Sequence, residues 1–394
     1  MEPRQIVPGI FLVGAIDWDR RLFDALIPLP DGTSYNSYLL KGSRKTALID
    51  TVDPSKTDIL FRNLKSAGVN NIDYVIANHG EQDHSGSLPA VLSAFPQAQV
   101  ITTPKCKEIL MCLLLIPENR ITTVEDKETL SLGDKTLEFI HFPWVHWPDT
   151  MLSYLREDKI LFPCDLFGSH LATSDMYVID EGRAYEAAKR YYAEIMMPFH
   201  LNIQRQWDKL KDYEIKIIAP SHGPMHNRPE FIMNAYRDWV GGPPKNSVVI
   251  PYVSMHDSTR LMVQHLTEAL TLRGVKVERF DLPVSDIGKL AMSMVDAATV
   301  IIGTPTVLGG AHPAAVYAAV LANALRPKVK FASVVSSYAW GGRAAEQLTT
   351  LLPNLKVELI PPVVIQGIPQ EADYRALDEL ADTVVAKHKE SKLT

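Results

Sequence analysis

The segment from His79 to Gly86, His-Gly-Glu-Gln-Asp-His-Ser-Gly, concentrates side chains that can bind a metal. It holds two imidazoles, at His79 and His84, and two carboxylates, at Glu81 and Asp83. Such a mixed set of nitrogen and oxygen donors suits iron, manganese or zinc. The alternative is a solvated polar turn that happens to contain two histidines. The close spacing of the four donors favours the metal site.

Three more candidate ligands each follow an apolar run that predicts a buried strand. A lone histidine or aspartate in such a place is more often structural than functional. Loops at strand ends can present chemistry from a rigid scaffold, so three such positions together indicate one shared site. The residues are His146 after 136–142, Asp165 after 160–164 and His222 after 215–219.

The first segment resembles the metal-binding loop of the metallo-β-lactamase superfamily, His-x-His-x-Asp-His, which usually holds zinc. Glu81 stands in place of the second histidine of that pattern. This replacement is typical of the flavodiiron proteins, in which His, Asp and His follow further along the chain. The resemblance implies two irons with the following ligands: His79, Glu81 and His146 on one iron, Asp83, His84 and His222 on the other, and Asp165 bridging both.

Two further residues are expected beside the metals on the same resemblance. His170 matches a histidine that the family places near the diiron pocket, and a surface or capping role is its alternative. Tyr191 or Tyr192 could give a proton or a hydrogen bond to a bound substrate. The resemblance favours Tyr191, with packing on an amphipathic helix as the alternative. Cys164 could be a ligand by position, but neighbours on a strand point to opposite faces, so inert core packing is expected.

Length and composition exclude several classes of protein. A chain of 394 residues predicts two or three domains. Lys plus Arg number 40 and Asp plus Glu number 46, and this net charge of −6 argues against nucleic acid as a partner. No apolar run is long enough to span a membrane, and the first residues lack a signal-peptide pattern. The three cysteines form no Cys-x-x-Cys pair, which indicates reduced thiols, a cytoplasmic location and no built-in rubredoxin module.

Residues 1–245 alternate short strands with helices, which predicts two sheets flanked by helices. The resemblance to metallo-β-lactamases specifies this arrangement as an αβ/βα sandwich. Strands are expected over 10–13, 37–40, 46–49, 74–77, 99–102, 136–142, 151–156 and 159–162, and helices over 54–67, 88–95 and 105–115.

The run of Gly, Pro and polar residues from 241 to 246 marks a domain boundary. From 248 to 394, five strands alternate with five helices, which predicts a flavodoxin-like, doubly wound parallel sheet. The fold class expected for the whole chain is therefore α/β and α+β in two domains. The strands are expected over 248–253, 275–280, 300–303, 331–335 and 357–364, and the helices end near 273, 298, 325, 352 and 388.

Three strand-to-helix loops of this second domain are candidates for binding FMN. The first is rich in hydroxyls and lacks the glycines of a dinucleotide loop, so it can hold a terminal phosphate at a helix N-terminus. The other two resemble the loops that flank the flavin ring in flavodoxins and flavodiiron proteins, with Trp340 as an aromatic wall. Asp257 would bring a carboxylate close to the phosphate, and His256 would stack on the flavin or line its rim. Ordinary turns without a cofactor are the alternative. The residues are Ser254, Met255, His256, Asp257, Ser258, Thr259, Thr304, Pro305, Thr306, Val307, Ser337, Tyr338, Ala339, Trp340, Gly341 and Gly342.

The resemblance covers nearly the whole chain and implies a function. It implies an oxidoreductase that reduces O₂ to water, NO to N₂O, or both, at a diiron centre supplied with electrons by FMN. A head-to-tail homodimer, or a dimer of such dimers, would bring each FMN beside the partner's irons. Rubredoxin or a reduced deazaflavin, F420, would be the external electron donor. Two other functions stay open: a zinc-dependent hydrolase fused to a flavodoxin domain, and a flavin electron carrier whose first domain only docks or supports.

Overall fold

The computed structural model describes residues 2–393, and the chain divides into two compact units. The first unit comprises the chain up to Tyr192 together with Phe199–Val240. The second comprises Ala193–Pro198 and the chain from Gly241 onward. The division thus falls between Val240 and Gly241, apart from the short segment Ala193–Pro198, which no sequence pattern predicted.

Two mixed sheets form the first unit. The larger has the order β1-β2-β7-β8-β9-β10-β11, and the smaller has the order β12-β13-β14-β15-β16. Two short strand pairs, β3–β6 and β4–β5, extend from this framework. The strands are β1 Arg4–Val7, β2 Ile10–Leu12, β3 Ala15–Asp17, β4 Leu22–Phe23, β5 Ile27–Pro28, β6 Thr33–Tyr35, β7 Tyr38–Lys41, β8 Thr46–Ile49, β9 Tyr74–Ile76, β10 Gln99–Thr102, β11 Ile121–Thr123, β12 Thr129–Ser131, β13 Thr136–His141, β14 Met151–Leu155, β15 Ile160–Phe162 and β16 Ile217–Ile218.

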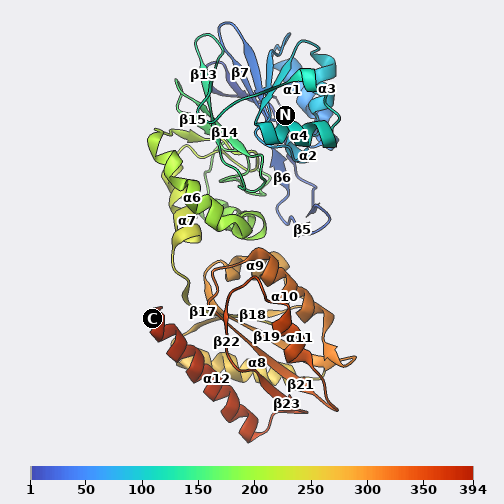
Figure 1. The fold of residues 1–394 in the computed structure, drawn as a ribbon, viewed down its shortest axis with the longest axis vertical. Helices are drawn as coiled ribbons and strands as arrows, with labels where there is room; N and C mark the ends of the chain where they lie inside the picture. The colour runs from blue at the N-terminus through green and yellow to red at the C-terminus, as the bar shows by residue number, and fades with distance from the viewer. Residues whose placement is uncertain (1, 394) are drawn as a thin grey trace. The chain divides into compact units, whose positions relative to one another are not determined.

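The larger sheet is buried on both faces, and β8 shows how its sequence achieves this. Successive side chains of a strand point to opposite faces. Ala47 and Ile49 pack between the two sheets with Phe139 and Phe162 of the smaller one. Leu48 faces the other way, into a core shared with the helices α1, α3 and α4, which lie together on that face (Figure 1). This confirms the predicted sandwich of two sheets flanked by helices.

The helices of the first unit include α1, α3 and α4, which cover one face of the larger sheet. The helices are α1 Thr57–Ser66, α2 Gln82–Ser85, α3 Leu88–Ala94, α4 Pro104–Leu113, α5 Glu181–Tyr191, α6 His200–Gln206 and α7 Pro229–Gly241, with 3₁₀ turns at Pro54–Lys56, Glu118–Arg120, Met197–Phe199 and Trp207–Asp212 and a π-helical turn at Tyr192–Met196. Among the described residues, none of the helices has the length and apolar character needed to cross a membrane.

The second unit is a parallel sheet with the order β18-β17-β19-β21-β22, and β23 also pairs with β21. The second strand in sequence lies outside the first, and the later strands follow on the other side, which is the flavodoxin order. This confirms the predicted fold. The elements are β17 Lys245–Tyr252, α8 Ser258–Leu272, β18 Lys276–Asp281, α9 Ile287–Met294, β19 Ala297–Val307, β20 Gly310–Ala311, α10 Pro313–Leu325, β21 Phe331–Tyr338, α11 Ala344–Thr350, β22 Glu358–Leu359, β23 Val363–Gln366 and α12 Glu371–Glu390.

Several elements of this unit differ from the prediction: β21 runs on to Tyr338, and α9 ends at Met294, because β19 begins at Ala297. β17 begins three residues early, within the stretch expected to be a linker. β19 runs on to Val307, because it pairs along its length with β21 and then turns back through β20. The single strand expected over 357–364 is two short ones, β22 and β23, each paired with a different part of β21.

A buried histidine connects α12 to the sheet of the second unit. His388 is fully buried, with Nδ1 2.7 Å from Asn246 Oδ1 and Nε2 2.7 Å from Thr299 Oγ1. The amide nitrogen of Asn246 donates to Gly274 O, so its oxygen accepts from Nδ1–H, and Nε2 then accepts from the Thr299 hydroxyl. Burial lowers the pKa of His388 to about 4. The imidazole is therefore neutral in the folded protein.

This histidine predicts a loss of stability on acidification. In the unfolded chain, His388 takes up a proton as the pH falls below about 6.5. In the folded protein, the same residue takes up that proton only near pH 4. The free energy of unfolding should therefore fall by about 1–2 kcal/mol between pH 7 and pH 5. In His388→Gln most of that fall should disappear, whereas His265→Gln, which changes a surface histidine paired with Asp378, should retain it. Chemical unfolding of the full chain at both pH values measures the difference, and an unchanged fall in His388→Gln would contradict the assignment.

Candidate metal and flavin sites

The segment that carries four of the candidate ligands begins after two residues that follow the end of β9 at Ile76. His79 and Glu81 lie on an irregular turn, whereas Asp83 and His84 lie in the one-turn helix α2, which the sequence did not predict. The carbonyl oxygen of Glu81 accepts hydrogen bonds from the amides of His84 and Ser85 and so begins that helix. The Ser85 hydroxyl donates to Gly80 O at 2.8 Å. These bonds turn the chain sharply, so that all four side chains face the same space.

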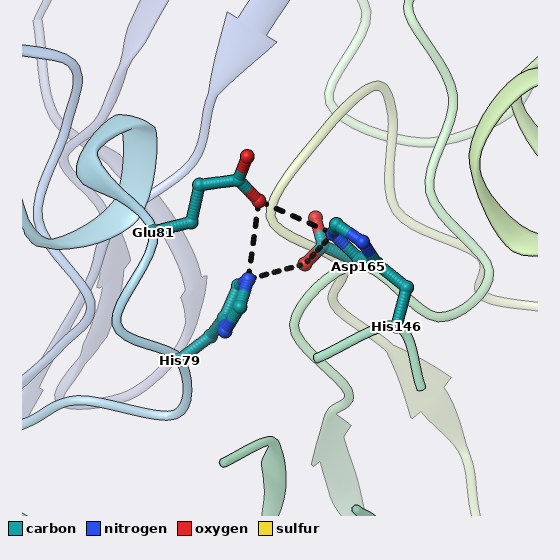
Figure 2. A group of neighbouring side chains, drawn as sticks. All are labelled: His79, Glu81, His146 and Asp165. Atoms are coloured by element: carbon teal, nitrogen blue, oxygen red, sulfur yellow. Dashed lines mark hydrogen bonds and ion pairs between the residues drawn. The ribbon is translucent and has the colours of Figure 1, made fainter. Parts of the chain in front are cut away.

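Four side chains from three loops converge around one point (Figure 2). His79 Nε2 and His146 Nε2 lie 3.1 and 3.2 Å from Glu81 Oε2. The same two nitrogens lie 3.8 and 3.6 Å from Asp165 Oδ2. These four donor atoms are close enough to bind one ion.

A second set of donors adjoins the first. His222 Nε2 lies 3.1 Å from Asp83 Oδ2, and His84 Nε2 lies 3.3 Å from Asp83 Oδ1. The other carboxylate oxygen of Asp165, Oδ1, lies 3.1 Å from His84 Nε2 and 3.4 Å from His222 Nε2. One oxygen of Asp165 thus faces each set. The seven predicted ligands are brought together in two sets that share this carboxylate.

The donor set fits two cations. Among the described residues, no group makes a hydrogen bond of acceptable geometry to either oxygen of Asp83 or to Nε2 of His84, all of which are buried; this is costly unless another group occupies the space between them. Burial alone would lower the pKa of His222, but Asp165 and Asp83 raise it to about 10. Protons therefore balance the carboxylates in the absence of a cation. Metal binding would displace those protons and satisfy the orphaned atoms.

Two more predicted residues border the second set. The Tyr191 hydroxyl donates to Asp165 Oδ1 at 2.8 Å, and burial with the nearby carboxylate holds the pKa of Tyr191 well above its ordinary value. The ring of His170 lies 4.8 Å from that of Tyr191 and 5.1 Å from that of His222. Burial and the neighbouring His222 hold the pKa of His170 well below its usual range. Tyr192 instead donates to Trp239 O, among buried aromatic rings.

His170 has one nitrogen in use and one without a partner. Its Nδ1 lies 2.9 Å from Thr33 Oγ1, whereas its buried Nε2 has no hydrogen-bond partner among the described residues. A small molecule or water beside the cluster could therefore hydrogen-bond to this neutral imidazole. The contacts of its ring with Tyr191 and His222 place His170 beside the second set of donors.

The sequence reasoning missed several polar groups that hold the ligands from behind. His79 Nδ1 contacts the carboxylate of Asp149, and His222 Nδ1 lies 2.7 Å from Ser34 O. Asp50, immediately after β8, is buried near His84 and accepts from the Asn78 amide. Burial raises the pKa of Asp50 to about 6. Of these residues, Asp149 was the easiest to predict from the sequence, because it lies three residues after His146. A buried carboxylate commonly orients a metal-binding histidine.

Cys164 is buried, as expected, but for a different reason. The chain has left β15 before residue 164, so the alternation of a strand does not apply there. Cys164 Sγ lies 3.7 Å from Asp165 Oδ2, so both side chains point inward. The thiol of Cys164 also lies within 4.8 Å of a potential ligand atom of Asp50 and of His84.

In the second unit, ten of the sixteen predicted flavin residues line a hollow at the carboxyl ends of β17, β19 and β21. This is the point in the flavodoxin order at which the chain reverses direction across the sheet, where such folds bind ligands. The Thr259 and Ser337 hydroxyls lie 3.0 Å apart at its base. Gly367, after β23, lines it as well and was not predicted. The lining residues are Ser254, Met255, His256, Ser258, Thr259, Pro305, Thr306, Ser337, Tyr338, Ala339 and Gly367.

The other predicted flavin residues lie outside this lining. Asp257 is turned away, because its carboxylate pairs with Arg260 Nε at 2.8 Å. Thr304 is buried and accepts from the His312 amide, and Val307 ends β19. Trp340 is 81% exposed. Gly341 and Gly342 follow it, and a Cβ at Gly342 would lie 2.3 Å from a methyl of Thr306.

Comparisons with known proteins agree with both halves of this description. A family model described as ODP family beta lactamase matches residues 33–223. The chain is 36% identical to a nitric oxide reductase of Moorella thermoacetica, over 98% of this chain and 99% of that one. It is 33% identical to a coenzyme F420H(2) oxidase of Methanothermobacter marburgensis, over 79% of each.

Solved structures resemble the whole chain as well. The rubredoxin oxygen:oxidoreductase of Desulfovibrio gigas has a TM-score of 0.95 and 29% identity, with all of both chains covered. The flavodiiron protein of Giardia intestinalis has a TM-score of 0.89 and 27% identity, with 98% of each chain covered. The resemblance therefore includes both units.

Proposed function

We propose that this chain, an oxidoreductase that belongs to the flavodiiron protein family, reduces O₂ to water, NO to N₂O, or both, at a diiron centre fed by FMN. The observation that carries the proposal is the position of Asp165, whose two oxygens face two separate sets of donors. One carboxylate between two sets suits a pair of metals about 3.5–4 Å apart. The relatives named above support the choice of reaction.

The donors favour iron over zinc. His79, Glu81 and His146 would hold one iron, Asp83, His84 and His222 the other, and Asp165 both. Bound there, two ferrous ions would supply electrons to O₂ or NO and bind its atoms side by side. Three carboxylates place three negative charges against the four positive charges of two ferrous ions. Such hard anionic donors stabilise the ferric state, which favours metals that give electrons away, whereas zinc does no redox chemistry.

The residues beside the metals can manage hydrogen bonds and protons. Tyr191 holds Oδ1 of Asp165 and is a protonated donor, so it orients the shared carboxylate. His170 is neutral, its ring lies beside that of His222, and its Nε2 has no hydrogen-bond partner among the described residues. Reduction of O₂ to water consumes protons as well as electrons, and these two groups can hydrogen-bond to a substrate or to the water that delivers protons.

Tyr191→Phe tests the first of these roles. The variant removes one hydroxyl and should still bind two irons, but its rate of O₂ or NO reduction should fall about 10- to 100-fold, because a positioned hydrogen bond is lost. Tyr192→Phe is a matched control, since it also removes one buried hydroxyl, which donates to Trp239 O instead. Single-turnover rates and iron content measure the two effects. Equal rates in the two variants would contradict the role.

The second unit would supply the remaining electrons. The hydroxyls around the N-terminus of α8, at Ser254, Ser258 and Thr259, suit the phosphate of FMN, and the ends of β19 and β21 suit its ring. Reduction of O₂ to two waters takes four electrons, two from the irons and two from reduced FMN. Coupling of two NO molecules takes two. One chain would therefore hold enough electrons for either reaction.

The proposal includes an assembly of chains and an external electron donor. We propose a head-to-tail homodimer, alone or paired with a second dimer, in which the FMN of one chain serves the irons of the other. An external donor must reduce the FMN, and relatives named after rubredoxin and F420H(2) make these two the first donors to try.

The purified protein tests the proposal directly. Iron analysis should find two irons per chain, and one FMN should be released on denaturation. Anaerobic stopped-flow mixing of the fully reduced protein with O₂ and with NO should show oxidation of both cofactors by at least one gas. Zinc in place of iron, or reduced cofactors that neither gas oxidises, would contradict the proposed function.

A further inference from the structure

The outer nitrogen of His79 faces a single buried carboxylate. His79 Nδ1 lies 3.2 Å from Asp149 Oδ1 and 3.3 Å from Oδ2, and both side chains are almost completely buried. An ionised carboxylate can only accept hydrogen bonds, so Nδ1 must carry the proton. The lone pair is then on Nε2, the atom that faces Glu81 and Asp165 (Figure 2). Asp149 therefore selects the form of His79 that can bind a metal.

The same carboxylate also holds the backbone of the ligand-bearing turn. The amide of Gly80 donates to Asp149 Oδ2 at 2.7 Å. A Cβ at position 80 would lie 2.6 Å from Ile109 Cγ2 and 3.1 Å from Asp149 Oδ2, so glycine permits this close approach. Asp149 itself lies three residues after His146, and its carbonyl accepts from Thr103 Oγ1 at 2.9 Å. One side chain thus connects the turn of His79 to the loop of His146.

The second set of donors has a different support. His222 Nδ1 lies 2.7 Å from the carbonyl oxygen of Ser34, a neutral acceptor. A carboxylate behind a metal-bound imidazole makes it a stronger donor than a carbonyl does. Asp50 is a buried carboxylate near this set, but among the described residues no hydrogen bond or ion pair joins it to His84, and its pKa is raised to about 6. The carboxylate in direct contact with a ligand imidazole is that of Asp149, so the stronger negative charge just outside the ligands lies beside His79.

We propose that Asp149 is a positioning residue of the metal centre, which fixes His79 with Nε2 toward the metal. Its charge also makes the set of His79, Glu81 and His146 bind Fe³⁺ more tightly than the set of Asp83, His84 and His222 does. The inference rests on the proposed diiron function. It adds an inequivalence of the two irons, with the lower reduction potential on the side of His79, Glu81 and His146.

Asp149→Asn provides the test. Asparagine carries no charge and has one acceptor oxygen where aspartate has two, so His79 Nδ1 and the Gly80 amide would have to share that oxygen. Asp73→Asn is the matched control, because Asp73 also accepts from a backbone amide, that of Thr46, and pairs with a cation, Lys45, away from the candidate ligands. Chelator competition should show one of two irons bound about 10- to 100-fold more weakly in Asp149→Asn only. Potentiometry followed by EPR should show that this same iron has a higher reduction potential in Asp149→Asn than in the unmodified protein.

A second measurement uses the unmodified protein and so does not depend on the folding of a variant. In protein loaded with Zn²⁺ and ¹⁵N-labelled histidine, long-range proton–nitrogen correlations should show His79 protonated at Nδ1. Two results would overturn the inference and leave the diiron function intact. One is an unprotonated Nδ1 of His79; the other is the same iron affinity in Asp149→Asn as in Asp73→Asn. An unmodified protein that binds no pair of metals would refute the proposed function itself.

Discussion

Replacement of Asp165 by alanine should abolish the paired metal site and lower the rate of O₂ or NO reduction by about a thousandfold or more. Its two oxygens are the only atoms among the described residues that face both sets of donors. Without them the imidazoles of the two sets face each other across an uncompensated gap, and the several kcal/mol that paired metals contribute to the reaction are lost. Iron content and anaerobic single-turnover rates measure the loss.

Asp208→Ala is a suitable control for this substitution. Asp208 is exposed and pairs only with Lys211 three residues away among the contacts described, so its loss should change neither iron content nor rate. Retention of two irons and of full activity in Asp165→Ala would reduce the first unit to a structural or docking module. The second unit would then be a flavin carrier.

Replacement of Ser258 by aspartate should weaken FMN binding by about a hundredfold or more. Ser258 is the first residue of α8 and lines the hollow in which the phosphate would lie. A carboxylate there would repel a phosphate at close range, at a cost of about 3 kcal/mol. The helix itself should not suffer, because an acidic residue in the first turn of a helix is favourable. Fluorescence titration of the FMN-free protein measures the affinity.

Ser258→Ala separates charge from the loss of the hydroxyl. That variant removes one hydrogen bond to a charged group and should weaken FMN about five- to tenfold. Equal affinities in the aspartate and alanine variants would place the phosphate elsewhere. Circular dichroism of both variants checks that α8 is intact.

The sequence predicted the parts of the sites that depend on local pattern. His79, His146, Asp165 and His222 each stand at the end of an apolar run, and strand ends in a sandwich lie at one edge, so their meeting could be inferred. The one-turn helix α2 could not, because four residues carry too little periodicity to reveal it. The extension of β19 was missed because Gly303 and Pro305 are typical of turns, and pairing with β21 overrides that preference.

The supporting residues escaped prediction for another reason. Ser34 and Asp149 reach their histidines from segments 188 and 70 residues away in the chain. Ser34 contributes only a carbonyl oxygen, which any residue type could offer, so nothing in the sequence marks it. Thr33, behind His170, lies 137 residues from its partner. Such contacts are set by tertiary packing alone.

The candidate ligands come from both sheets of the sandwich, which has a consequence for durability. His79 follows a strand of the larger sheet, whereas Asp165 follows a strand of the smaller one. A metal pair bound between them would connect the two sheets. Because a ligand that binds only the folded state stabilises that state, the metals would raise the resistance of the first unit to unfolding. Stripping the metals should therefore leave a first unit that melts earlier and is cut sooner by proteases, so that a shortage of iron would shorten the life of the protein as well as stop its chemistry.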